Sequence, residues 1–306
     1  MHIKYFKTAF IGMVFLGAFS AVLTSCSSDD NESESTEQPT DGRKLRQLTI
    51  TDVPITRAML TDNTTSLGAT WSAGDKATYF NLSSYNSTVM HFGTLISSKE
   101  ATESTFTGTV QCTHGEKIAL FYPATDPFTS GSDRGTFAIN LSGQKGTLED
   151  VANNYHYIYG VGVITSVTDN TANATIASMK SLLAVCKFTF KDNTDVGIPV
   201  KELTIGYGNY KYPLSGTVKP SYNASSVVAN PAAANTWNPL TVTLVNEKVD
   251  GVYVALFPCG NASREEFHFT VTGSTGTYTG TATAKLNAGK FYPVTLNLTK
   301  QIIKNQ

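Results

Sequence analysis

The sequence predicts an all-β protein built as two β-sandwich domains in series. Apolar and polar residues alternate with a period of two over many short segments, which is the pattern of half-buried strands. Charged residues make up only 15% of the 306 residues, below the usual level of about 25%. Much of the remaining polarity comes from Ser, Thr and Asn, which suit strands and turns. No long segment carries apolar residues at helical spacing, so these observations together favour sandwiches.

The first 25 residues have the features of a secretory signal peptide. Lys4 and Lys7 form a basic region, and the fifteen residues 9–23 are apolar or small apart from Ser20. Such a run is too short to span a bilayer comfortably. It ends in Leu-Thr-Ser-Cys, which resembles the bacterial lipobox, whose cysteine is acylated and becomes the mature N-terminus. We expect a lipoprotein signal peptide over residues 1–25 and lipid attachment, with palmitate among the acyl chains, at Cys26; a plain signal peptide that contains a cysteine is the alternative.

Residues 26–44 are expected to form a disordered acidic tether. They hold six carboxylates among Ser, Thr, Asn, Gln and Pro, and they lack the apolar residues that could offset the entropy lost on ordering. An acidic run directly after a lipidated cysteine resembles the surface-export signal of Bacteroidetes lipoproteins. We therefore expect an outer-membrane lipoprotein exposed on the cell surface, although a merely solvated linker would have the same composition.

The N-terminal domain is expected over residues 45–175. Its first strand alternates Leu48 and Ile50 with polar residues and ends at Asp52 and Pro54. Trp71 precedes a turn at Gly74-Asp75, and we expect its indole to pack in the core or at its rim. The remaining strands are expected at turn-bounded intervals, through residues 79–82 and at 89–96, 104–110, 117–122, 136–141 and 155–163.

The C-terminal domain is expected over residues 176–306, after a polar stretch at 171–175. Its first strand, residues 181–190, places five apolar side chains on one face: Leu182, Ala184, Cys186, Phe188 and Phe190. Residues 221–238 read as a long surface loop. Further strands are expected at 200–205, 214–218, 240–245, 252–257, 266–271, 275–283 and 290–298.

The cysteines give little sign of a disulfide or metal framework. After Cys26, the chain has Cys112, Cys186 and Cys259, which cannot all pair and show no C-x-x-C spacing. An exported protein could form one disulfide between Cys186 and Cys259. We favour Cys186 as a small core residue instead.

The sequence shows no local signature of catalysis. The histidines are dispersed, no G-x-S-x-G occurs, and the glycine pairs lack the third glycine of a dinucleotide loop. We expect no enzyme, no metal and no cofactor; a glycosidase carboxylate pair from distant strands stays open. The lack of a basic stripe argues against nucleic acid. Trp237, in a loop, is the candidate contact for a sugar, although anchoring of its own loop is favoured.

Short motifs follow one another in a definite order behind the lipobox: Ile55-Thr56-Arg57-Ala58, Trp71-Ser72-Ala73-Gly74-Asp75, Phe106-Thr107-Gly108, Phe121-Tyr122-Pro123-Ala124, Leu182 to Phe190, Ala255-Leu256-Phe257-Pro258 and Ala288 to Leu296. The series covers residues 45–298 and resembles the fimbrillin (Mfa-like) family of Bacteroidetes, the subunits of type V pili. The resemblance implies two transthyretin-like β-sandwich domains and a structural subunit of a cell-surface fimbria that contributes to adhesion.

The resemblance also implies assembly by strand exchange. A trypsin-like protease cuts such pilins after an arginine and removes the tethered N-terminal strand, and a strand of another subunit then fills the groove. An open sheet edge beside an apolar cleft is a site for strand addition. The candidate cleavage site is Arg57, because Arg43 and Arg46 both precede the first strand and a cut there would leave the groove filled.

The last residues bear on the position of the subunit in the fibre. Stalk subunits of this family carry a donor extension after the last core strand, whereas residues 299–306 offer only Ile302 and Ile303, of which one could point inward. We expect a tip or accessory subunit. The alternatives are a pilus anchor that stays lipidated and a surface-tethered glycan-binding lipoprotein. The expected partners are other pilin subunits, the outer membrane through the lipid before maturation, and a host or bacterial surface glycan or protein.

Overall fold

The structure is a computed structural model that describes residues 43–54, 59–84, 89–132, 134–207, 211–221, 227–232, 238–259 and 264–302. Residues 41–306 form one compact unit. Strands dominate the described residues, whose helical segments are η1 (Leu82–Ser84), α1 (Leu148–Asp150) and η2 (Val151–Tyr155). None of these is long and apolar enough to cross a membrane. The predicted all-β class is confirmed.

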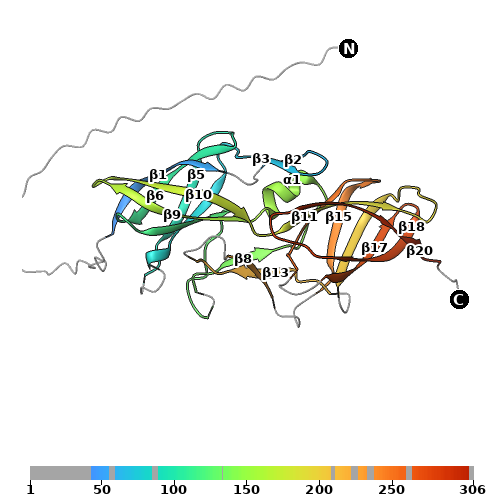
Figure 1. Cartoon of the computed structure of the whole chain (residues 1–306). Helices are drawn as coiled ribbons and strands as arrows, with labels where there is room; N and C mark the ends of the chain where they lie inside the picture. Colours follow the sequence, from blue (N-terminus) through green and yellow to red (C-terminus); the bar gives the residue numbers. More distant parts are fainter. Residues whose placement is uncertain are drawn as a thin grey trace, which may run out of the picture. The chain divides into compact units, whose positions relative to one another are not determined.

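Seven strands of the N-terminal half form a closed barrel in the order β1-β10-β9-β7-β4-β5-β6 (Figure 1). Neighbours in the barrel are antiparallel except β1 and β10, which run parallel. The barrel closes because β1 pairs along both of its edges. The strands are β1 (Lys44–Pro54), β4 (Lys76–Asn81), β5 (Phe92–Ser97), β6 (Glu103–Cys112), β7 (Lys117–Tyr122), β9 (Ile158–Val167) and β10 (Thr171–Ser181).

The C-terminal half contains a three-stranded sheet, β16-β11-β19, and a five-stranded sheet, β15-β12-β17-β18-β20. Buried aromatic rings from both sheets meet, since Phe188 of β11 lies edge-on to Phe269 of β17 with ring centroids 5.4 Å apart. This is the packing of a sandwich core. The strands are β11 (Ala184–Lys191), β12 (Val200–Tyr207), β15 (Leu240–Lys248), β16 (Val252–Leu256), β17 (Glu265–Gly273), β18 (Gly276–Ala284), β19 (Phe291–Asn297) and β20 (Thr299–Lys300).

Two smaller sheets complete the described strands. One has the order β14-β13-β8 and combines a strand of the N-terminal half with two of the C-terminal half. The other is the hairpin β2-β3. These strands are β2 (Met59–Asp62), β3 (Leu67–Thr70), β8 (Phe137–Asn140), β13 (Ser215–Val218) and β14 (Ala229–Pro231).

The buried side chains form two hydrophobic clusters. One fills the barrel, and the other includes barrel residues such as Phe80 and Phe121 together with the C-terminal sheets. Strands β4 and β7 contribute to both, because their side chains are buried on both faces. The predicted boundary at residue 175 falls inside β10, whose pairing with β9 continues to Ser181. The two-domain division stays a prediction.

The structure corrects three local expectations. The polar stretch 171–175 is the start of β10, where Ala172 and Ala174 are buried; small alanines between polar residues gave too weak an apolar alternation to reveal a strand. Tyr155, predicted to begin a strand, ends η2, and β9 begins at Ile158. The predicted loop at 221–238 contains the short strand β14.

Candidate functional site

The first strand of the barrel occupies a slot between two other strands. β1 pairs with β6 from Lys44, opposite Cys112, to Pro54, opposite Glu103. On its other edge it pairs with the start of β10. We call the space that β1 fills between β6 and β10 the β1 groove. It is the candidate functional site because the strand that fills it comes first among the described residues.

The floor of the β1 groove is apolar. Leu48, Ile50 and Val53 point into the barrel and are fully buried, which stabilises the fold by about 1.5–3 kcal/mol for each side chain. Strict alternation after Ile50 would bring Asp52 inward and turn Val53 out. Instead, the register shifts between Ile50 and Val53, and Asp52 adopts a φ of 50°. The bulge therefore keeps the carboxylate outside and the valine inside.

Trp71 forms a hydrogen bond with the C-terminal end of β1. Its buried Nε1–H donates a hydrogen bond of 3.0 Å to the carbonyl oxygen of Val53. The indole packs edge-on against Phe106 and Tyr122, with ring centroids 4.7 Å and 5.4 Å away. The prediction that Trp71 packs in the core or at its rim is confirmed. Its bond to β1 was not predicted, because nothing local links it to Val53.

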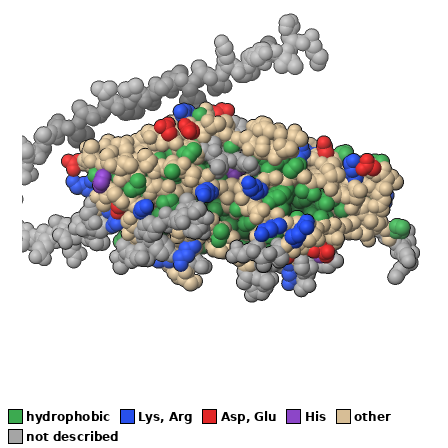
Figure 2. Space-filling model, viewed as in Figure 1, with side chains coloured by type: hydrophobic (Ala, Val, Ile, Leu, Met, Phe, Trp, Pro, Cys, Tyr) green, Lys and Arg blue, Asp and Glu red, His purple; other side chains and the backbone are tan. Residues whose placement is uncertain are grey.

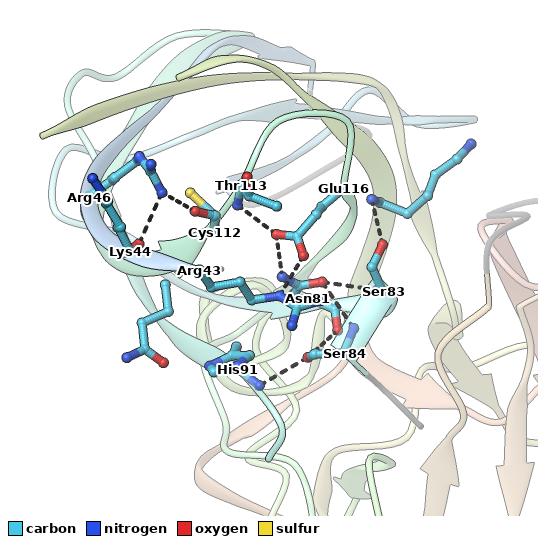
Figure 3. A network of polar contacts seen from close by, with 12 residues as sticks. Arg43, Lys44, Arg46, Asn81, Ser83, Ser84, His91, Cys112, Thr113 and Glu116 are labelled. Carbon is cyan, nitrogen blue, oxygen red and sulfur yellow. Dashed lines mark hydrogen bonds and ion pairs between the residues drawn. The ribbon is translucent and has the colours of Figure 1, made fainter. Parts of the chain in front are cut away.

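A covered carboxylate lies at the N-terminal end of β1 (Figure 3). The side chain of Glu116 is only 6% exposed and accepts a hydrogen bond from Arg43 Nε at 2.5 Å. Its second oxygen accepts from Asn81 Nδ2 at 2.7 Å and from the amide of Thr113 at 2.8 Å. Glu116 therefore binds one cationic donor, which precedes β1, and two neutral donors, which belong to the rest of the barrel.

Arg46 adds a second guanidinium at this end. It belongs to the inward row of β1, two residues before Leu48, and is 6% exposed. Its guanidinium donates to the carbonyl oxygens of Cys112 and Thr168, the latter at 2.6 Å. These oxygens lie at the end of β6 and just before β10, so Arg46 bridges the two sides of the groove. We call Arg43, Arg46, Asn81, Thr113 and Glu116 the mouth cluster.

A third basic residue of β1 is held differently. Lys44 forms an ion pair of 3.0 Å with Asp169, and the two side chains are 62% and 85% exposed. The hydrogen bond from Lys44 lowers the pKa of Asp169. An exposed pair of this kind contributes little to stability. It therefore provides an internal contrast to the covered Arg43–Glu116 pair.

The three site residues predicted from the sequence, Cys26, Arg57 and Trp237, lie outside the described residues. The prediction of Cys186 as a core residue is confirmed, since its side chain is 1% exposed and its thiol is free. Burial raises the pKa of that thiol. Among the described residues, no group of three or more His, Cys, Asp or Glu could hold a metal ion.

A small apolar pocket lies in the C-terminal half between strands β11, β16, β17, β18 and β19. It encloses about 40 Å³ and is lined by Phe, Leu, Ala, Val and Cys side chains only. A sugar would find no oxygen or nitrogen of a side chain in this lining. The pocket therefore does not fit a glycan. Figure 2 shows that hydrophobic side chains also reach the surface on the face in view, among backbone atoms and side chains that are neither hydrophobic nor charged.

No protein-family model and no curated protein sequence matches the chain. Among solved structures, a "putative cell adhesion protein" from Bacteroides uniformis matches with a TM-score of 0.52 and 14% identity, over 86% of this chain and 95% of that one. A protein described in the same words from Bacteroides ovatus matches with a TM-score of 0.51 and 13% identity, over 86% of this chain and 100% of that one.

A looser match is the tip fimbrial protein Mfa3 from Porphyromonas gingivalis with C-terminal truncation. Its TM-score is 0.39 at 10% identity, over 85% of this chain and 97% of that one. This match adds nothing to the fold assignment. The two Bacteroides structures do, and along most of its length this chain has their fold.

Proposed function

We propose that the chain is a structural subunit of a cell-surface fimbria, exported as a lipoprotein through Cys26 and assembled by strand exchange in the β1 groove. The observation that carries the proposal is the pairing of β1 along both edges, ahead of every other described strand. Removing β1 would expose the backbone groups of β6 and β10 and an apolar floor between them. A strand from another subunit would restore both. The likeness in fold to proteins described as adhesion proteins supports a surface role.

The placement of the arginines favours cleavage after Arg57. Arg46 was expected to precede the first strand, but it lies within β1, and its guanidinium is buried between β6 and β10. A protease must bind its substrate in an extended, accessible form, so it would first have to unpair this strand. Cuts after Arg43 or Arg46 would also leave Leu48 to Val53 in the groove. Arg57 follows the last residue of β1 by three positions, so a cut there releases the whole strand.

The hairpin after the cut is held independently of β1. Asp62 of β2 accepts a hydrogen bond from Lys187 Nζ at 2.6 Å and another from the hydroxyl of Tyr253 at 2.5 Å. Both donors belong to the C-terminal half. We therefore propose that β2 stays in place when β1 leaves, so that cleavage empties only the groove.

The test is the N-terminus of the protein in assembled fibres. Sequencing and intact-mass measurement are expected to show a chain that begins at Ala58 and carries no acyl group. Arg57→Gln is expected to keep this subunit out of the fibres, whereas Arg264→Gln, at an exposed arginine, is expected to leave its incorporation unchanged. Fibre protein that begins at Lys44 or Gln47 would refute the cleavage site. Fibre protein that keeps the lipid and residues 26–57 would refute strand exchange and favour an anchor.

A further inference from the structure

Glu116 makes one end of the β1 groove acidic once β1 has left with the two arginines of the mouth cluster. We propose that the groove selects its incoming strand by charge, with Glu116 binding an arginine at the end of a strand supplied by a neighbouring subunit. The inference rests on the proposed function, because it presupposes that β1 is exchanged. It adds the chemistry of the partner strand. That strand would place alternate apolar side chains on the floor of the β1 groove and a guanidinium beside Glu116.

The need for a cation follows from what β1 takes with it. Glu116 and its neutral donors Asn81 and Thr113 belong to the part of the chain that stays, whereas Arg43 and Arg46 leave with β1. An incoming strand covers Glu116 again. A neutral strand would then leave a desolvated carboxylate with two neutral hydrogen bonds and no counter-charge, which is unfavourable. A strand with a cation at this point restores the original ion pair.

The geometry favours arginine over lysine. The Arg43 Nε–H reaches one oxygen of Glu116, and the guanidinium of Arg46 donates to backbone oxygens on both sides of the groove. A planar guanidinium has five donors in a rigid fork, whereas an ammonium is a compact point charge. Strand β1 is thus a template for its replacement, with the inward row Arg46, Leu48, Ile50 and Val53.

Neighbouring charges do not substitute for the arginine. Asp169 and Lys44 lie at the same end of β1, but their pair is exposed and can be solvated by water. Glu116 differs because its side chain is only 6% exposed when the strand is in place, so water can solvate it far less than it solvates Asp169. The selection is therefore assigned to Glu116 and not to the general charge of this end of the barrel.

The test is a double-mutant cycle between the protein and a synthetic strand. The full chain, cut by a site-specific protease at a site introduced into residues 55–58, is mixed with fluorescent peptides of the sequence of residues 43–54. Fluorescence anisotropy reports their exchange into the groove.

Replacing Arg43 by glutamine in the peptide is expected to weaken binding to the wild-type protein about tenfold, as for one charged hydrogen bond. The same replacement is expected to weaken binding to the Glu116→Gln protein less than threefold. The matched control, Lys44→Gln in the peptide against Asp169→Asn in the protein, is expected to change affinity less than threefold throughout.

A second measurement keeps the inference testable if Glu116→Gln does not fold. A peptide with citrulline, the neutral isostere of arginine, at position 43 is expected to bind the wild-type protein about tenfold more weakly than the parent peptide. Equal affinities, or an equal loss in both proteins of the cycle, would overturn selection by charge while leaving strand exchange intact. Failure of the parent peptide to exchange at all would instead overturn the proposed function and this inference with it.

Discussion

Asp62 and Glu116 are largely covered carboxylates, and each has a cationic partner from a distant part of the chain. Glu116 is bound by groups around the mouth of the barrel, whereas Asp62 ties the β2-β3 hairpin to Lys187 and Tyr253. The pKa of Asp62 is lowered most by the hydrogen bond from Lys187 and next by the hydrogen bond from Tyr253. The Asp62 carboxylate therefore contributes more to stability when it is ionised than when it is protonated.

The Asp62 pair predicts a pH-dependent stability. Because the pKa is lower in the folded than in the unfolded protein, the contribution is fully present above the unfolded value of about 3.9 and is lost as pH falls through the folded value. Asp62→Asn is expected to lower the free energy of unfolding by about 1 kcal/mol at pH 7, and the difference from wild type is expected to shrink at pH 3. Urea denaturation at both pH values measures this.

A matched control is Asp195→Asn. Asp195 pairs with Lys191 at 2.9 Å, but its side chain is 77% exposed, so the change is expected to stay within about 0.5 kcal/mol. A difference for Asp62→Asn that is as large at pH 3 as at pH 7 would contradict the role assigned to its ionised form.

At the scale of elements, the short motif in β6 determines how closely this strand packs against its neighbours. In Phe106-Thr107-Gly108, Phe106 is buried against Trp71 and Gly108 lies opposite Leu48 of β1. A Cβ on Gly108 would lie 2.5 Å from the carbonyl oxygen of Thr94 and 2.8 Å from a methyl group of Leu95. The backbone oxygen belongs to β5 and cannot move aside without disturbing the sheet. The glycine therefore sets the close approach of β5 to β6.

Gly108→Ala is expected to destabilise the protein by about 3 kcal/mol, the upper end of the usual cost of overpacking. Gly115→Ala is the comparison, since Gly115 has a φ of +80° with nothing within 4 Å of an added Cβ. It is expected to cost about 1–2 kcal/mol from backbone strain alone. Thermal or urea unfolding of the two variants decides the point: equal losses would show that the close contact with β5 does not matter.

At the scale of the whole molecule, the proposed exchange depends on what each end of the chain offers. Strand β1 presents three fully buried side chains to the groove. The described C-terminal residues instead continue the protein's own sheet: β20 pairs with β18, and the amide of Gln301 donates to Thr277 at 2.8 Å. Ile302 is 85% exposed. A tip or accessory position in the fibre stays our prediction.

Deleting residues 300–306 is expected to leave the length and number of fibres unchanged. One large apolar side chain from this segment would contribute about 1.5–3 kcal/mol in a groove. Strand β1 buries three apolar side chains there, so the segment would stabilise the groove much less than β1 does. Electron microscopy of cells that carry the deletion measures fibre length, with cells that make the wild-type protein as the reference. Shortened or missing fibres would show that this segment is a donor and that the subunit belongs in the stalk.

The sequence alone was sufficient for features that depend on neighbouring residues. The period-two alternation predicted the all-β class and most strands, and the core position of Cys186 followed from its place on an apolar face. The turn before β4 follows the same rule, since Asp75 accepts a hydrogen bond from the amide of Ser72 at 2.8 Å and Gly74 has a φ of +89°. Strands with weak alternation, such as β10, were missed because their burial comes from the strands that cover them. One signal of the site was available: Arg46 stands two residues before Leu48 and so shares its inward face.

Only the tertiary structure decided which strands are neighbours and what lies at the ends of β1. Arg46 meets the carbonyl oxygens of residues 66 and 122 positions away, and Asp62 meets Lys187 across 125 positions. The alternation of apolar and polar residues predicts that a strand has a buried face, but it does not predict which other strands pair with its two edges. Those pairings follow from the apolar surface buried and the backbone hydrogen bonds satisfied over the whole barrel. For that reason, the mouth cluster could be found only in the folded chain.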